Sequence, residues 1–349
     1  TYNDLESINC PLCSSTDHVL LFKGRDRLLY PNLVRPNEFF GVTKCRNCQF
    51  IFTSPRVPGN RIYEYYPDTY YPDEVEYSVQ TRLNYGELNC KSRLVQKDIF
   101  TRIHGFNSIF SEGPISSFTD VILKLFSLIR QFRINPINFN GEGKYLLDIG
   151  CGSGKYLSQQ KTLNWNVKGI ENSSKAVAIC NKANLDVING DFLESDIKET
   201  FHVIHLNQVL EHLYNPRAVI KKIYSLMKPG GALILTFPNI RSLVSRVYKQ
   251  YWFNLDLPRH VNFFHRKSIK GFLREEGFSV VDNYCISSTR GITGSREYVR
   301  RDKFGERIQP RALRDNKALN SKMVLPTRVL DIMGIGNNLY VIGRKNRTS

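Results

Sequence analysis

Residues 147–154 read Leu-Asp-Ile-Gly-Cys-Gly-Ser-Gly and close an apolar, strand-like run. Because glycine has no Cβ, Gly150, Gly152 and Gly154 allow the main chain to turn sharply and to approach a ligand closely. A helix is expected from Lys155, and the amides at a helix N-terminus attract polar and anionic groups. We therefore predict a strand, a ligand-binding turn and a helix in this order.

The pattern continues toward the C-terminus as apolar strand-like runs that alternate with amphipathic helices. This alternation predicts an α/β fold in which helices cover both faces of a parallel sheet. We expect strands at residues 145–149, 167–171, 186–189, 203–206, 232–238, 279–284 and 339–343.

The spacing of the glycines separates two kinds of cofactor loop. A dinucleotide fingerprint reads Gly-x-Gly-x-x-Gly, and counted from Gly150 its last position falls on Lys155. Gly-x-Gly-x-Gly preceded by Asp148 resembles instead the loop of class I methyltransferases that use S-adenosylmethionine. Residues 226–231, Leu-Met-Lys-Pro-Gly-Gly, resemble the turn before the fifth strand of these enzymes. The resemblance covers about residues 145–285 and implies a Rossmann-like sheet of seven strands.

Acidic residues follow three successive expected strands, and the resemblance implies a part of the cofactor for each. Asp148 would hold the methionine ammonium group through water, Glu171 the ribose hydroxyls, and Asp191 the adenine amino group. Phe192 would pack on the adenine ring, and Asn207, at the end of the fourth strand, would complete the site. Each acid alone also fits a helix cap, but three acids together with the glycine loop favour the cofactor site.

The fourth expected strand leads into residues 206–213, Leu-Asn-Gln-Val-Leu-Glu-His-Leu. The carboxyl ends of parallel strands face the active crevice in such folds, and small-molecule methyltransferases of this kind have a similar Val-Leu-Glu-His sequence here. Glu211 and His212 would act as a base, orient the acceptor or bind a divalent metal. In the alternative interpretation, Glu211 holds the glycine loop and His212 closes the start of a helix.

An aromatic segment after the fifth strand contains Pro258, Arg259 and His260. It resembles an element of bacterial methyltransferases found with surface-sugar pathways. Methyl transfer requires removal of a proton from the acceptor, which suits a histidine, so His260 is the first candidate base and His212 the second. Arg259 would bind a phosphate or carboxylate of the acceptor. A structural histidine bonded to the backbone is the alternative for His260, and His265 is expected to cap the helix that follows.

Two Cys-x-x-Cys pairs, Cys10/Cys13 and Cys45/Cys48, lie near the start of the chain. Four thiolates fit a tetrahedral zinc ion and leave no open position, so the predicted zinc is structural. The pairs and the Phe-Ile-Phe-Thr-Ser-Pro-Arg run that follows resemble the opening of bacterial methyltransferases of deoxysugar, capsule and O-antigen pathways. Gln49 departs from the glycine that is usual in that group.

These motifs divide the chain into three predicted parts. Residues 1–56 form the zinc-binding head, and residues 57–140 an aromatic linker with lid helices at 81–103 and 118–133. Residues 141–349 form the methyltransferase domain with a basic insertion at about 285–335. The helix at 118–133 also has the pattern of a membrane-surface helix, although packing as a lid is the preferred interpretation.

The chain carries 49 Lys and Arg against 32 Asp and Glu, a net charge of +17. Residues 290–349 hold 14 basic and 5 acidic residues, so the excess is concentrated there. A basic segment of this kind attracts nucleotide phosphates, RNA or an acidic surface, or it is a solvated face. Enzymes that methylate amino groups of nucleic acids use Asn/Asp-Pro-Pro-Tyr, which residues 237–239 do not match.

The expected function is methyl transfer from S-adenosylmethionine to a sugar or related small molecule, nucleotide-linked or part of a glycan, with oxygen favoured over carbon. RNA is the alternative acceptor. Neither a membrane-spanning run nor a signal-peptide pattern at Thr1–Cys10 is found, which favours a cytoplasmic protein. The oligomeric state is left open by the sequence.

Overall fold

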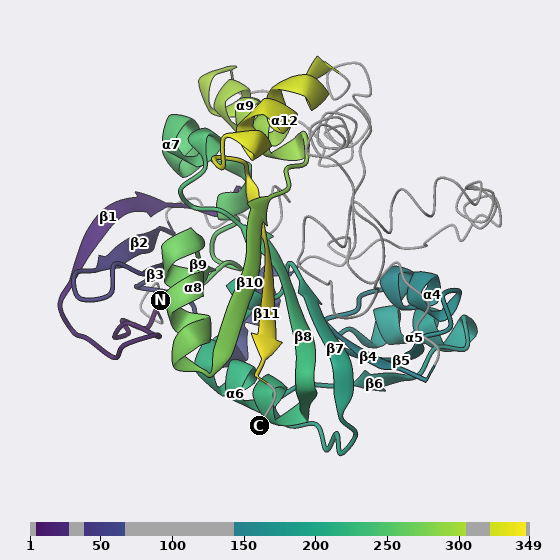
Figure 1. The fold of residues 1–349 in the computed structure, drawn as a ribbon. Coiled ribbons are helices and arrows are strands. Elements are labelled where there is room, and N and C mark those ends of the chain that lie inside the picture. The colour runs from purple at the N-terminus through teal and green to yellow at the C-terminus, as the bar shows by residue number, and fades with distance from the viewer. Residues whose placement is uncertain (1–4, 28–37, 67–142, 305–321, 347–349) are drawn as a thin grey trace, which may run out of the picture. The chain divides into compact units, whose positions relative to one another are not determined.

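The structure is a computed structural model that describes residues 5–27, 38–66, 143–304 and 322–346 (Figure 1). The chain divides into two compact units, residues 1–71 with 190–349, and residues 72–189. The predicted lid helices at 81–103 and 118–133, most of the linker and the centre of the basic insertion lie outside the described residues.

The cysteine head is an antiparallel sheet of β1 (His18–Gly24), β2 (Phe40–Cys45) and β3 (Ile51–Thr53), followed by a 3-10 turn, η1 (Gly59–Tyr65). Its fourth strand is β9 (Asn262–Phe263), which comes more than two hundred residues later and pairs Ile51 with Phe263. The predicted head therefore shares its sheet with the segment that follows Pro258, which the local sequence pattern does not reveal.

The same unit contains four strands in the order β10-β11-β8-β7 (Figure 1). They are β7 (Phe201–Asn207), β8 (Met227–Pro238), β10 (Phe278–Cys285) and β11 (Asn338–Lys345). Strands β7 and β8 are parallel, whereas β11 is antiparallel to both β8 and β10. The sheet is therefore mixed, not wholly parallel as the strand–helix alternation suggested.

Short helices connect these strands. They are η2 (Leu210–His212), α6 (Pro216–Leu226), α7 (Leu243–Tyr248), η3 (Lys249–Tyr251), η4 (Phe253–Leu255), α8 (Arg266–Glu275), α9 (Arg290–Phe304) and α12 (Val324–Ile332). Helix α6 buries Val219, Ile220 and Ile223, which recur at helical spacing. Helix α8 runs beside β10 (Figure 1) and begins at His265, whose ring accepts a hydrogen bond from Ser268 N. The predicted cap is confirmed.

The second unit is a compact β-α-β-α-β arrangement. It consists of β4 (Tyr145–Ile149), α4 (Lys155–Lys161), β5 (Asn166–Glu171), α5 (Ser174–Lys182) and β6 (Val187–Asn189). Strands β4, β5 and β6 are parallel, with Asp148 opposite Gly169 and Glu171 opposite Asn189. Buried Leu146, Leu147 and Leu157 supply apolar contacts in this unit.

All seven predicted strands are confirmed, with bounds that differ by a few residues. Three of them, β4, β5 and β6, lie in the unit of residues 72–189, and the other four lie in the first unit. The largest difference is β8, which begins at Met227 because its pairing with β7 extends back to Phe201 through a register shift.

Candidate functional site

The turn between β4 and α4 has the conformation that its glycines predict. Gly150, Gly152 and Gly154 have φ values of 68°, 53° and 75°, in the left-handed region that favours glycine. A Cβ at Gly154 would lie 2.5 Å from Leu185 Cδ1, so packing also requires glycine there. At Gly152 a Cβ would meet no described atom within 4 Å, so this side of the turn is open.

Glu171 holds this turn from the end of β5. Its Oε2 accepts a hydrogen bond from Gly152 N at 2.9 Å, and its Oε1 accepts one from Ser173 N at 2.9 Å. The side chain is buried, so these two bonds satisfy a carboxylate that would otherwise be costly inside the protein. Each carboxylate oxygen can accept a further hydrogen bond, so this arrangement is compatible with the predicted ribose contact.

The other predicted cofactor residues lie near the ends of strands or just after them. Asp148 is buried near the end of β4. Asp191 is exposed, and its Oδ1 accepts from Leu193 N at 2.7 Å. Phe192 is buried, with the Lys222 ammonium 4.9 Å from its ring centroid, and Asn207 is the exposed last residue of β7. Their contacts with a cofactor stay predictions.

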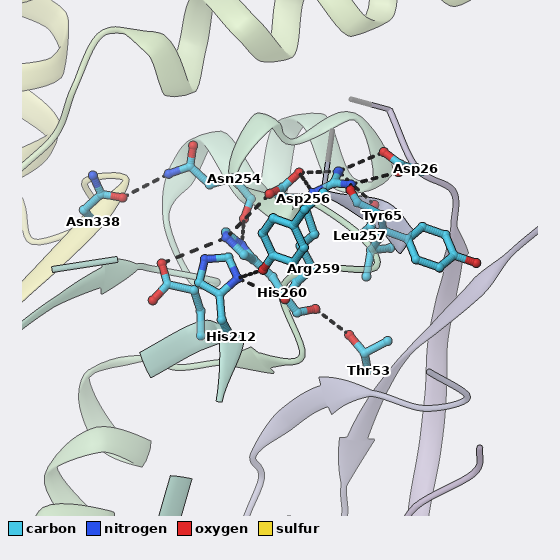
Figure 2. Close-up of polar contacts among 12 residues, drawn as sticks. Asp26, Thr53, Tyr65, His212, Asn254, Asp256, Leu257, Arg259, His260 and Asn338 are labelled. Atoms are coloured by element: carbon cyan, nitrogen blue, oxygen red, sulfur yellow. Dashed lines mark hydrogen bonds and ion pairs between the residues drawn. The ribbon is translucent and has the colours of Figure 1, made fainter. Parts of the chain in front are cut away.

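Glu211, His212 and His260 form a second cluster, and Figure 2 labels its two histidines. The two imidazole rings meet edge to face, with their centroids 4.6 Å apart. His260 Nε2 lies 4.0 Å from Glu211 Oε1 and 3.9 Å from Asp256 Oδ2. Glu211 and His260 are buried, whereas His212 is partly accessible. The structure thus brings together the two sequence segments that were predicted to be catalytic.

Main-chain carbonyls determine how both histidines carry their protons. His212 Nδ1 lies 3.1 Å from Arg259 O, and His260 Nδ1 lies 2.9 Å from Asn254 O. Because a carbonyl oxygen only accepts, each Nδ1 must donate, and in the neutral ring Nε2 then carries the lone pair. Burial lowers the pKa of both histidines, that of His212 to about 3. Both rings are therefore neutral at physiological pH.

Glu211 is the least satisfied group of the cluster. Its side chain is 1% exposed, and neither carboxylate oxygen has a hydrogen-bond partner among the described residues. Burial, and then the charge of Asp256, raises the pKa of Glu211 to about 8. A buried acid without a partner favours its neutral form or a bound cation.

Arg259 has a different position from the one expected of an acceptor-binding residue. Its guanidinium is 1% exposed and bonds Asp26 through both terminal nitrogens, at 2.9 and 2.8 Å (Figure 2). It also donates to Asp256 Oδ1 at 2.7 and 3.0 Å and to Tyr65 O at 2.8 Å. With all three nitrogens engaged in the interior, Arg259 holds the segment in place and presents no donor to an acceptor anion.

Sequence reasoning missed Asp26, Asp256 and Tyr66, which complete this cluster. Burial would raise the pKa of Asp256, but the Arg259 charge outweighs it and lowers that pKa to about 2. Tyr66 places its hydroxyl 3.1 Å from His212 Nδ1. The position of Asp256 three residues before Arg259 was a usable signal for an ion pair, whereas nothing near Asp26 pointed to a partner 233 residues away.

The cluster is fixed to the cysteine head by hydrogen bonds. Thr53 Oγ1, in β3, donates to His260 O at 2.9 Å, and Thr53 N donates to Val261 O at 3.0 Å. Val261 N in turn donates to Glu211 O at 2.8 Å, and Asn262 Nδ2 donates to Leu213 O at 2.6 Å. The head therefore positions the main chain on both sides of the cluster.

The four predicted zinc ligands are brought together at one side of the head. Cys10 Sγ and Cys48 Sγ lie 3.5 Å apart, and Cys13 Sγ and Cys45 Sγ lie 3.6 Å apart. Thiolates bound to zinc at ~2.3 Å in a tetrahedron are ~3.8 Å from one another, so the arrangement fits a tetrahedral metal. Cys151, Cys180 and Cys285 are also buried, and none of them belongs to this group.

Residues 121–283 match the family described as a methyltransferase domain. The chain contains a methyltransferase domain. The matched residues include the glycine turn, Glu171 and the Glu211–His212–His260 cluster, whereas the cysteine head lies before them. In the part of the chain that the structure describes, no helix is long and apolar enough to cross a membrane.

The methyltransferase domain is similar to two enzymes named as ubiquinone biosynthesis O-methyltransferases. The mitochondrial protein of Schizosaccharomyces pombe is 27% identical over 171 residues, which is 43% of this chain and 58% of that protein. The protein of Paraburkholderia phymatum is 28% identical over 154 residues, or 40% of this chain and 66% of that protein. The chain thus spans less than two thirds of the length of either relative.

Solved structures of S-adenosylmethionine-dependent methyltransferases are similar at a lower level. That from Archaeoglobus fulgidus has a TM-score of 0.42 and 20% identity, covering 66% of this chain and all of that one. That from Mesorhizobium loti has a TM-score of 0.41 and 13% identity, covering 60% and 94%. The fold assignment therefore rests on the strand arrangement and the family match.

Proposed function

We propose that the chain transfers a methyl group from S-adenosylmethionine to an oxygen atom of a small-molecule acceptor. The observation that carries this proposal is the match of residues 121–283 to a methyltransferase domain, together with the left-handed glycine turn tied to Glu171. Oxygen is supported as the methylated atom by relatives whose names specify O-methyltransferases. The cofactor supplies the activated methyl group, and the protein orients the acceptor and takes up its proton.

Replacing Glu171 with Ala is expected to weaken S-adenosylmethionine binding by about 1–3 kcal/mol. The change removes the proposed ribose contact and the bonds that hold the glycine turn. Titration calorimetry measures the affinity, with Glu199→Ala, an exposed acid, as the control. An affinity equal to that of the unaltered protein would refute the assignment of Glu171 to the cofactor site.

The narrower proposal for the acceptor is a sugar or a related molecule, nucleotide-linked or part of a glycan. Its support is the resemblance of the cysteine head to those of sugar and polysaccharide methyltransferases. Tyrosines of η1 add to it, because Tyr63 is 70% exposed and aromatic faces stack on sugar rings.

The proton of the acceptor hydroxyl is assigned to the Glu211–His212–His260 cluster. His212 is the first candidate in place of His260, because part of its side chain is accessible whereas His260 is buried. An asparagine in place of His212 or His260 has no atom that corresponds to Nε2, so it removes the lone pair that would accept the proton.

His212→Asn is expected to leave cofactor affinity nearly unchanged and to reduce turnover by ~10²–10⁴. The matched control is His202→Asn, near the other end of β7. Turnover is measured as label transfer from S-adenosylmethionine in excess cofactor. If the His212 variant turns over at the rate of the control, the cluster is not needed to prepare the acceptor.

A structural zinc ion at Cys10, Cys13, Cys45 and Cys48 is part of the same proposal. Its support is the sulfur spacing and the number of thiols, because four thiolates complete a tetrahedral zinc site and leave no position open to substrate. The zinc would therefore stabilise the head and take no part in methyl transfer.

Nothing in the described residues favours RNA over a small molecule as the acceptor. Among these residues, several basic groups of the unit that carries α9 and α12 are paired with acids. Arg25 and Arg27 bond Asp302, Arg300 bonds Glu297, and Arg328 bonds Asp331.

A further inference from the structure

The turn that follows β6 contains Asp191 and Phe192, the two residues predicted to contact adenine, and a lysine of α6 is directed at its main chain. Lys222 Nζ donates to Phe192 O at 2.5 Å, to Ser195 O at 2.6 Å and to Leu193 O at 3.0 Å. An ammonium group has three hydrogens to donate. Each of them can therefore bind a carbonyl oxygen of this one turn.

Lys222 forms no ion pair with an acid among the described residues. Its side chain is only partly accessible, so the ammonium group has lost part of its hydration. The carbonyl dipoles, the Ser195 hydroxyl at 3.3 Å and the Phe192 ring, whose centroid is 4.9 Å away, replace that hydration. The neighbouring Lys221 is exposed. The contacts of Lys222 are thus directed at the turn and not at the surface of α6.

The shape of the turn depends on this cation. Three carbonyl oxygens converge on the Lys222 ammonium group, each within 3.0 Å of Nζ. Carbonyl oxygens only accept hydrogen bonds, so without a donor between them they would repel one another. Loss of the ammonium group would leave these partly buried acceptors unsatisfied, which is costly, and the turn would open to reach water.

The main chain of the turn orients the Asp191 carboxylate. Leu193 N donates to Asp191 Oδ1 at 2.7 Å, and Ser195 Oγ donates to Phe192 O at 2.8 Å. Both bonds depend on the path of the main chain through residues 192–195, which is the segment that Lys222 binds. Asp191 is exposed, and its Oδ2 accepts no hydrogen bond from a described residue. This oxygen can accept a hydrogen bond from a ligand amino group.

We propose that Lys222 is a positioning residue for the adenine end of the cofactor site. It draws three carbonyls of the turn together and so holds the main chain in the shape that presents Asp191 to the adenine amino group. This step rests on the proposed function, because adenine belongs to S-adenosylmethionine. Lys222 acts through Asp191 and has no part in methyl transfer itself. Its effect is on which purine the site accepts.

The test uses two probes that differ at the edge of the purine ring. S-adenosylhomocysteine carries the adenine amino group, whereas S-inosylhomocysteine carries a carbonyl oxygen at the same position. A carboxylate accepts a hydrogen bond from the amino group and repels the oxygen, so a correctly placed Asp191 favours the adenine compound. Titration calorimetry on the full chain gives the ratio of the two affinities. It is measured for the unaltered protein, for Lys222→Met and for the matched control Lys221→Met.

We expect the unaltered protein and Lys221→Met to prefer the adenine compound by at least about tenfold. Lys222→Met should lose most of that preference, because the turn no longer holds Asp191 in place. Asp191→Ala should lose it as well. Adding Lys222→Met to Asp191→Ala should lower the ratio no further, since the lysine acts through the aspartate and the two changes are not additive.

A folded Lys222→Met protein that keeps the preference of the control overturns the proposal, even if it binds both probes more weakly, because a merely structural role would not change the ratio. Circular dichroism confirms folding. Lys222→Gln, whose amide keeps donor hydrogens but not the charge, is judged by the same ratio if methionine prevents folding. An overturned proposal leaves the proposed function standing while the unaltered protein binds S-adenosylhomocysteine. Failure of that protein to bind either probe would contradict both.

Discussion

Cys45→Ser is expected to remove the metal from the four-cysteine head and to lower the thermal midpoint of unfolding by about 10 °C or more. Cys45 is fully buried at the end of β2. Structural zinc sites contribute about 10–16 kcal/mol in small metal-dependent domains, so loss of one ligand should cost several kcal/mol here. Zinc content by mass spectrometry and a thermal melt of the same sample provide the measurement.

Cys285→Ser is the matched control, because Cys285 is also buried but lies in β10. It should retain the zinc and shift the midpoint far less. A protein that keeps its midpoint after chelation of the metal, or a Cys45 variant that behaves like the Cys285 variant, would show that the head does not depend on zinc.

The same variant should also affect the histidine cluster. Strand β3 follows the cysteine pair and bonds to His260 O and Val261 O through Thr53. Unfolding of the head therefore removes the main-chain support of Glu211 and His260. The head would thus act on the cluster through these main-chain hydrogen bonds, and the proposed zinc would take no part in the reaction.

Arg259→Met is expected to reduce the free energy of unfolding by about 3–5 kcal/mol. Methionine fills part of the volume but leaves Asp256, Asp26 and Tyr65 O without the donor that binds them. An uncompensated buried carboxylate is the main cost. Urea denaturation followed by fluorescence measures the loss.

Arg46→Met provides the comparison, since that side chain is 64% exposed and lies 3.7 Å from an exposed Asp17. Its loss should be within about 0.5 kcal/mol. If Arg259→Met reduced the free energy of unfolding no more than Arg46→Met does, the Arg259 guanidinium would not stabilise the fold. The earlier expectation that Arg259 binds an acceptor anion would then be reopened.

The strands and the cofactor turn could be predicted from sequence because their signals are local. Apolar runs of about five residues, glycines at alternate positions and an acid at a strand end are visible within short windows, and residues 145–171 contain all three. The antiparallel direction of β11 was not predicted, because the strand–helix alternation ends before the long segment that precedes it.

The buried cluster was predicted only in part, for a physical reason. Glu211, His212 and His260 were singled out by their residue types, but their burial and mutual contact depend on pairing of β3 with β9 across the chain. The role of Arg259 was reversed by Asp26, a partner that no local pattern identifies. Long-range ion pairs leave no periodic trace in a sequence.

Label transfer from radioactive S-adenosylmethionine into fractionated cell extract tests the central claim most directly. The protein is incubated with the extract, and label is counted separately in small-molecule, nucleotide-sugar, polysaccharide, RNA and protein fractions. We predict label in the small-molecule or sugar fractions, attached to oxygen and lost with the His212→Asn variant. Label confined to RNA or protein would contradict the proposed function.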